Sequence, residues 1–132
     1  MLKIVEVHPT PRAQGEYVVL QNVGLVNVNL RGWALCTDAF LEADNLRLAE
    51  EMYIFREDVQ IKPYARVVLF TGIGDNEWLP TIDGKHAYCA YWGRSEPVWT
   101  DAANVHVLHM LTTRRIVFPS TQHTPAVQAQ AS

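Results

Sequence analysis

The sequence predicts an all-β fold, more specifically an immunoglobulin-like β-sandwich of about seven to nine strands. Nearly every apolar cluster is short, rich in β-branched and aromatic residues, and bounded by turn-forming residues. Most of these clusters have no helical segment between them, unlike the strands of a parallel α/β sheet. The chain has 132 residues, of which 48% are hydrophobic, so it is long enough for one domain with a single core.

Each predicted strand follows from a local apolar pattern that ends at glycine, proline or another turn residue. Val18 and Leu20 share one face of the second strand, with Tyr17 and Val19 on the other. Residues 66–70 are apolar on both faces, which is typical of a central strand. In chain order, the predicted strands are residues 2–8, 16–22, 32–37, 53–55, 66–70, 86–92, 104–110 and 115–118.

Residues 39–52 carry two conflicting signals. Leu41, Leu48 and Met52 fall at helical spacing, whereas Asp44-Asn45 suits the tip of a hairpin. We expect a hairpin excursion here. Residues 38–58 also contain seven acidic and two basic residues, which favours a solvated loop over a cation site.

The composition changes after Phe118. Residues 119–132 are rich in Pro, Ser, Thr, Gln and Ala, so we expect a folded domain over residues 1–118 and a flexible tail over 119–132. Glu6 and His8 interrupt the first apolar stretch, and no small-residue cleavage site follows it. The N-terminus therefore favours a cytoplasmic protein over an exported one, although a processed N-terminus would allow an extracellular location.

Charge and cysteine content exclude several classes of protein. The net charge of -3 counts against binding by phosphate neutralisation, which makes nucleic acid the less favoured partner. No apolar run approaches the roughly 20 residues of a membrane-spanning helix. Cys36 and Cys89 lack a CxxC partner, which rules out a four-thiolate metal site. Reduced buried thiols are expected here, with a Cys36–Cys89 disulfide as the alternative.

An ordered set of motifs resembles the lamin-tail domain family, in its bacterial, stand-alone form. The resemblance covers roughly residues 2–118 and implies an immunoglobulin-like sandwich. Animal members bind nuclear proteins and chromatin, and bacterial relatives accompany surface enzymes as adhesion or targeting domains. The matching segments are Ile4-Val-Glu-Val7, Glu16-Tyr-Val-Val-Leu-Gln-Asn22, Val28-Asn-Leu-Arg-Gly-Trp-Ala-Leu35, Tyr53-Ile-Phe55, Ile61-Lys-Pro63, Val67-Val-Leu-Phe-Thr-Gly72 and Val98-Trp-Thr-Asp101.

Four residues of these motifs have structural roles on physical grounds alone. Gly32 permits a positive φ or a close approach before Trp33, whose large ring suits a core. Glu16 and Asn22 stand at strand ends, where their side chains can bond the backbone amides of loops.

No catalytic or metal-binding set is predicted, and no cofactor. His106 and His109 are three residues apart on a strand and therefore point to opposite faces. A nucleophile elbow and a complete phosphate-binding glycine motif are both absent from the sequence. The chain is therefore not expected to be an enzyme.

The best candidate for recognition is the segment around Trp92, Arg94, Glu96 and Trp99, because aromatic residues and arginine are favoured in binding hot spots. The same residues could instead close one end of the core, with Arg94 paired to Glu96, which is the commoner role. Trp78 is expected to be exposed and could serve in recognition as well.

Three functions remain open, in this order. The first is a non-enzymatic module that binds a protein partner, or a second copy of itself through an exposed strand edge. The second is a carbohydrate- or nucleic-acid-binding module in which exposed tryptophans provide stacking platforms. The third is an enzyme with an unrecognised site.

Overall fold

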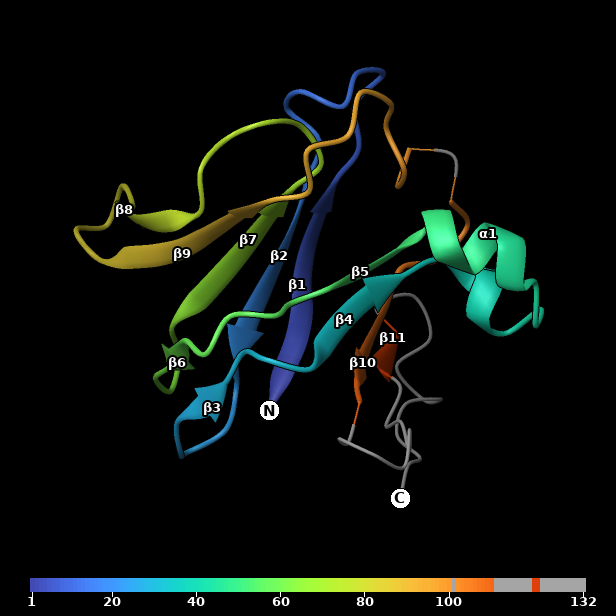
Figure 1. Cartoon of the computed structure of the whole chain (residues 1–132). Helices are drawn as coiled ribbons and strands as arrows, with labels where there is room; N and C mark the ends of the chain where they lie inside the picture. Colours follow the sequence, from blue (N-terminus) through green and yellow to red (C-terminus); the bar gives the residue numbers. More distant parts are fainter. Residues whose placement is uncertain (101, 111–119, 122–132) are drawn as a thin grey trace. The chain divides into compact units, whose positions relative to one another are not determined.

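The computed structural model describes residues 1–100, 102–110 and 120–121 of the chain (Figure 1). These residues form an all-β fold with two short helical segments, which confirms the predicted class. The described part contains eleven strands, more than the seven to nine expected, because several are only two residues long. The immunoglobulin-like sandwich itself stays a prediction.

The structure divides into two compact units. Unit 1 comprises Met1–Val28 and Ile61–Asp101, and unit 2 comprises Asn29–Gln60 and Ala102–Ser132. The short strands β3 (Val28–Asn29) and β6 (Gln60–Ile61) pair as a two-stranded sheet.

Unit 1 contains a five-stranded mixed sheet, whose strands lie side by side in Figure 1. Neighbouring strands are antiparallel except for β7 and β9, which are parallel. The strand over residues 66–70 is central, as its apolar pattern predicted. In spatial order the strands are β1 (Leu2–His8), β2 (Tyr17–Asn22), β7 (Arg66–Phe70), β9 (His86–Tyr91) and β8 (Glu77–Pro80).

Alternation along these strands separates a buried face from a partly exposed one. Val18 and Leu20 are fully buried, and so are Val67 and Leu69 of the neighbouring strand. Full burial of a Val or Leu side chain stabilises a fold by about 1.5–3 kcal/mol, so this face supplies much of the sheet's stability.

Unit 2 contains a four-stranded antiparallel sheet. Ala34, Cys36 and Leu108 form its buried cluster, against which Leu48 and Met52 pack. In spatial order the strands are β11 (Ser120–Thr121), β10 (His106–His109), β4 (Trp33–Cys36) and β5 (Met52–Ile54).

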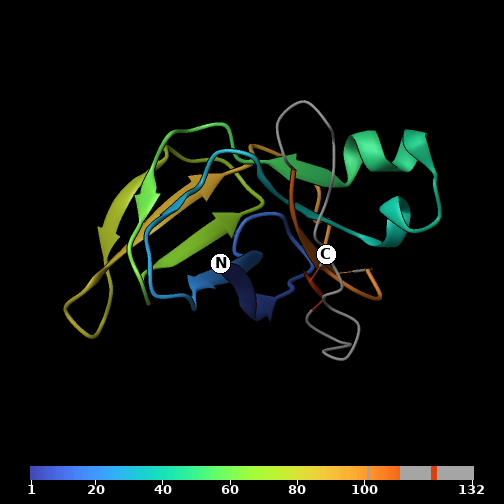
Figure 2. The same cartoon turned by 90° about the horizontal axis from the view of Figure 1, so that it is seen from below.

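The hairpin expected over residues 39–52 is wrong, because this segment is helical. The 3-10 helix η1 (Asp38–Phe40) is followed by helix α1 (Asn45–Glu50). The side chain of Asp44 accepts a hydrogen bond from the backbone N–H of Arg47 and so caps α1, where we had expected a hairpin tip. Figure 2 shows this excursion leaving the end of β4 and returning to β5. Neither helix has the length and apolarity to cross a membrane.

Other differences concern the strands at the edges of the sheets. No strand was predicted around Trp78, where the structure contains strand β8. Ser120 and Thr121, from the predicted tail, form β11 and pair with β10. The strand predicted at 115–118, the turn before it and the rest of the tail lie outside the described residues.

We predict that Gly32→Ala destabilises the protein more than Gly84→Ala does. Gly32 has φ +90°, and a Cβ there would lie 3.2 Å from the backbone oxygen of Met110. Gly84 has φ +84° with no atom within 4 Å of such a Cβ, so it controls for backbone strain alone. Urea unfolding should show a loss of about 1–3 kcal/mol for Gly32→Ala. Equal losses for the two variants would contradict the close-approach role of Gly32.

Candidate functional site

The four clustered recognition residues predicted from the sequence lie on one loop of unit 1, residues 92–100, which we call the 92–100 loop. The guanidinium carbon of Arg94 lies 5.1 Å from the centre of the Trp92 ring, which is cation–π geometry. Trp92 and Arg94 are half-buried and Glu96 is exposed, but Trp99 is only 2% exposed. Trp99 therefore belongs to the core, 5.7 Å from Trp92 between ring centres, and does not offer a contact surface. The Arg94–Glu96 ion pair stays a prediction.

Trp78 is not part of this cluster. It lies on β8 opposite Tyr88 and contacts the Tyr88 ring edge-on, with 5.5 Å between ring centres. Tyr88 precedes Trp92 by four residues, a separation of roughly 13 Å along an extended strand. Trp78 is 42% exposed, as expected, but separately from the 92–100 loop.

A buried carboxylate holds the 92–100 loop in place. The side chain of Glu16 is fully buried. Its Oε1 accepts hydrogen bonds from the Thr71 hydroxyl (2.6 Å) and the Val98 N–H (2.9 Å). Its Oε2 accepts from the Trp99 N–H (3.0 Å), the Thr100 N–H (2.8 Å) and the Thr100 hydroxyl (2.8 Å). Five donors therefore replace the water that the charge loses on burial.

The backbone of Glu16 is fixed in the same way. Its N–H donates to the Ala13 carbonyl (3.2 Å), and its carbonyl accepts from the Thr71 N–H (3.0 Å). The residue thus joins the start of β2, the end of β7 and the 92–100 loop. The sequence predicted that Glu16 bonds loop backbone amides, and these hydrogen bonds are of that kind.

Asn22 plays a matching part at the other end of β2. Its side chain is buried, and its Nδ2 donates to the carbonyls of Val26 and Ile61, both at 2.9 Å. Its Oδ1 accepts from the Gly24 N–H (2.9 Å) and the N-terminal amine of Met1 (3.1 Å). All four contacts are internal to unit 1, so the side chain of Asn22 holds the N-terminus, the turn after β2 and Ile61 together.

A second loop lies beside the 92–100 loop and was not identified from the sequence as part of a site. The N–H groups of Gly93 and Arg94 donate to the carbonyls of Gly72 (2.8 Å) and Thr71 (2.9 Å). Ile73 follows directly and is 72% exposed. We call Ile73, Trp92, Arg94 and Glu96 the recognition edge. The isoleucine between Gly72 and Gly74 is the sequence feature that indicates this part of the site, because a turn rarely requires an apolar residue.

A row of aromatic rings crosses the more exposed face of the same sheet. His8, Tyr17, Phe70 and Tyr91 are directly opposite one another on successive strands. His8 stacks on Tyr17 with 4.7 Å between ring centres, and Phe70 stacks on Tyr91 with 4.9 Å. A Cβ on Gly74 would lie 2.5 Å from the Tyr91 ring, so the backbone there covers that ring. Tyr91 is thus enclosed between Phe70 and the backbone at Gly74, and His8 stands at the exposed end of the row.

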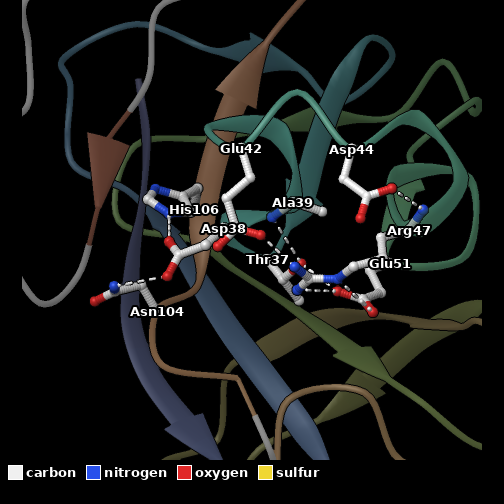
Figure 3. A network of polar contacts seen from close by, with 9 residues as sticks. All are labelled: Thr37, Asp38, Ala39, Glu42, Asp44, Arg47, Glu51, Asn104 and His106. Carbon is white, nitrogen blue, oxygen red and sulfur yellow. Dashed lines mark hydrogen bonds and ion pairs between the residues drawn. The ribbon is translucent and has the colours of Figure 1, made fainter.

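Unit 2 holds a polar network around Asp38 (Figure 3). Asp38 Oδ1 lies 2.6 Å from Nε2 of the buried His106, and its Oδ2 accepts from the Asn104 amide at 3.0 Å. Burial alone would raise the pKa of Asp38, but these two hydrogen bonds outweigh it and leave the pKa below 3.8. The ionised carboxylate can only accept, so the proton of this contact sits on His106 Nε2.

The neighbouring acidic side chains are bound by hydroxyl and guanidinium groups of the same network. The Thr37 hydroxyl donates to Glu51 (2.5 Å) and accepts from the Ala39 N–H (3.2 Å), which caps η1. Arg47 forms ion pairs with Glu51 (3.1 Å) and Glu42. The acidic stretch thus organises its own helical excursion, and these exposed pairs contribute little to stability because solvent screens them.

The other candidate chemical groups are engaged in the core. Cys36 and Cys89 are free, buried thiols, as expected. Burial, with the nearby Asp38 charge, raises the pKa of Cys36 to about 12, which opposes the thiolate that a nucleophile requires. His109 stacks on Trp33 with 4.4 Å between ring centres. Within residues 1–100, 102–110 and 120–121, no three His, Cys, Asp or Glu side chains are grouped so that they could hold a metal ion.

Comparison with known proteins gives no assignment, since no family model and no curated protein matches this chain. The lamin-tail resemblance therefore rests on the sequence motifs alone.

We predict that Asp38→Asn weakens the fold at pH 6 but flattens its loss of stability in acid. A carboxyl with a lower pKa in the folded chain stabilises the fold above its unfolded pKa. That contribution disappears as the pH falls from about 4 through the folded pKa. The variant should lose about 1–3 kcal/mol of unfolding free energy at pH 6.

Urea unfolding at pH 6, 4 and 3 measures this effect. The exposed Asp75, changed to Asn, removes one carboxylate outside the Asp38 network and is measured in parallel as the matched control. A parallel pH dependence in Asp38→Asn and wild type would contradict the role of the Asp38 network.

Proposed function

We propose that this chain is a non-enzymatic protein-interaction or targeting module of the lamin-tail type, and that it binds its partner through the recognition edge. The observation that carries the proposal is the buried Glu16 carboxylate, which fixes the loop that presents Trp92 and Arg94. A pre-ordered loop loses little conformational entropy on binding, which favours affinity. Arg94 and Trp92 belong to the residue types that dominate binding hot spots.

The chemistry of the buried polar groups supports a non-enzymatic reading. Glu16 and Asn22 are saturated by hydrogen bonds inside unit 1, and Asp38 is held by His106 and Asn104 inside unit 2. A general acid or base needs a lone pair or proton that faces a substrate. These side chains instead form their hydrogen bonds with groups of the fold itself.

The carbohydrate- and nucleic-acid-binding alternatives have weaker support. Sugar platforms present the flat face of an aromatic ring, but Arg94 lies over one face of Trp92 and Trp99 is buried. Trp78 is exposed, yet it contacts Tyr88 at an angle of 67° and stands apart from the 92–100 loop. The net charge of -3 gives nucleic acid no general electrostatic attraction.

Self-association through a strand edge also has less support than the recognition edge. The register of β1 shifts between Ile4 and Glu6, and a bulge or irregularity of this kind discourages pairing with another chain. At the opposite edge of the sheet, β8 is only four residues long and ends in Pro80, which lacks an N–H donor.

Ile73→Asp and Arg94→Glu should each abolish capture of a partner. The immobilised wild-type protein would be incubated with an extract of its native organism, and the retained proteins compared between variants. Because hot-spot changes commonly cost about 2 kcal/mol or more, we expect at least about a thirtyfold loss of affinity for a partner that uses this edge.

Leu46→Asp is the matched control, because Leu46 is an apolar side chain that is 84% exposed on α1 in unit 2 and is not one of the residues of the recognition edge. It should retain the same proteins as the wild type. Light scattering after size-exclusion chromatography tests self-association in the same samples. A strictly monomeric protein whose captured set is unchanged in Ile73→Asp and Arg94→Glu would overturn the proposal.

A further inference from the structure

Unit 1 contains a small polar pocket that the recognition edge does not include. Its volume is about 90 Å³, which suits a single charged group, because pockets for whole small molecules are usually about 300–1,000 Å³. Its walls come from β2, the start of β7, and the hairpin between β8 and β9. The lining residues are Gln21, Tyr64, Ala65, Arg66, Thr81, Asp83, Lys85 and His86.

Basic side chains dominate the charge of this pocket. Arg66 and Lys85 line it together with His86, against the single carboxylate of Asp83. Asp83 accepts hydrogen bonds from the Thr81 hydroxyl and from the Lys85 backbone N–H (3.2 Å), which hold the hairpin turn. In the described part of the chain, neither Arg66 nor Lys85 has a side-chain ion pair. The pKa of Asp83 is lowered, mainly by the hydrogen bond from Thr81 and in smaller part by the charge of Lys85. A chain with a net charge of -3 therefore gathers two cations around one carboxylate in this depression.

Tyr64 lies in the wall of this pocket in an unfavourable backbone conformation. Its φ is +69°, a left-handed value that bulky side chains rarely adopt. The backbone is held there by two hydrogen bonds, from the Tyr64 N–H to the Asn22 carbonyl (2.7 Å) and from the Gln21 amide to the Tyr64 carbonyl (3.0 Å). The side chain is 64% exposed, so burial does not repay the strain. Strain of this kind clusters at ligand-binding positions.

We propose that this pocket binds the oxyanion of an acidic peptide, either a side-chain carboxylate or a phosphoryl group. Arg66 offers planar paired donors that match both kinds of oxyanion, and Lys85 adds a compact second charge. The Tyr64 ring stands at the wall, where it contacts the chain that carries the anion. The small volume and the single pair of cations suit one anionic group better than the continuous phosphate backbone of a nucleic acid.

This site is independent of the recognition edge, and its test is a titration of the full chain followed by ¹⁵N–¹H NMR. The probes are inorganic phosphate, acetate, a hexaglutamate peptide, a phosphoserine hexapeptide and a ten-residue thymidine oligonucleotide, with sodium chloride at matched ionic strength as the blank. We expect saturable shifts confined to the amides of residues 64–66 and 81–86. Acetate and phosphate separate the two oxyanions, and the two peptides show which of them a partner would carry.

Single-charge variants identify the groups responsible. Arg66→Gln and Lys85→Gln should each weaken peptide binding about two- to fivefold, the effect of one exposed ion pair. Arg12→Gln removes an exposed charge on a different loop and should bind like wild type. Ile73→Asp should also bind like wild type, so failure of this proposal is distinguishable from failure of the recognition edge.

Tyr64→Gly separates the ring from the charges. This variant should raise the melting temperature, because glycine adopts a positive φ without strain. It should also weaken peptide binding while leaving inorganic phosphate binding unchanged. The proposal is overturned if the shifts match those in chloride, if Arg12→Gln weakens binding as much as Arg66→Gln, or if the oligonucleotide binds more tightly than both peptides.

Discussion

The buried carboxylate of Glu16 is the interaction on which the rest of unit 1 depends. An isolated ionised carboxylate in an apolar core costs many kcal/mol, so the group is tolerated only where donors surround it. Here the donors come from Thr71 and from residues 98–100, which are distant from Glu16 in sequence. The charge cannot be buried unless these segments converge. Once it is buried, separating them costs free energy because the carboxylate would lose its hydrogen-bond donors.

The same constraint orders the 92–100 loop, which carries three of the four residues of the recognition edge. The 92–100 loop has no regular secondary structure between β9 and β10, and loops of this kind are usually mobile. Three consecutive N–H groups of this loop, from Val98 to Thr100, are aimed at one side chain. Trp99 is buried, and Arg94 lies over the ring of Trp92. A structural carboxylate thereby produces a rigid surface.

Much of the fold could be predicted from local pattern. Residues 66–70 carry apolar side chains on both faces, and the central position of β7 follows directly from that burial. Glu16 and Asn22 stand at strand ends in the sequence, where unpaired loop amides need acceptors. The helix α1 was missed because Asp44 suits both a hairpin tip and a helix cap, and tertiary packing of Leu48 against unit 2's cluster decided between them. Strand β8 was missed because its alternation is short and ends in proline.

The two proposed sites were harder to predict, because each depends on contacts between distant residues. Ile73 and Arg94 belong to one surface because the N–H groups of Gly93 and Arg94 donate to the carbonyls that directly precede Ile73. These hydrogen bonds extend the β7–β9 pairing beyond the strands. Gln21 and Arg66 line one pocket because β2 and β7 place them opposite each other. The positive φ of Tyr64 could not be predicted from its residue type, because tyrosine rarely adopts this conformation. Sequence reasoning therefore found the residue types that suit recognition, and the register of the strands decided which of them meet.

Amide hydrogen exchange of Glu16→Gln tests the central role of the carboxylate most directly. Glutamine keeps the size of the side chain, but its NH₂ group must face at least one of the N–H donors, which leaves that donor without an acceptor. We expect exchange at Val98, Trp99 and Thr100 to accelerate by at least about tenfold, while amides in the centre of β2 and β7 keep their wild-type protection. Unchanged protection at residues 98–100 in the folded variant would contradict the central role of the carboxylate.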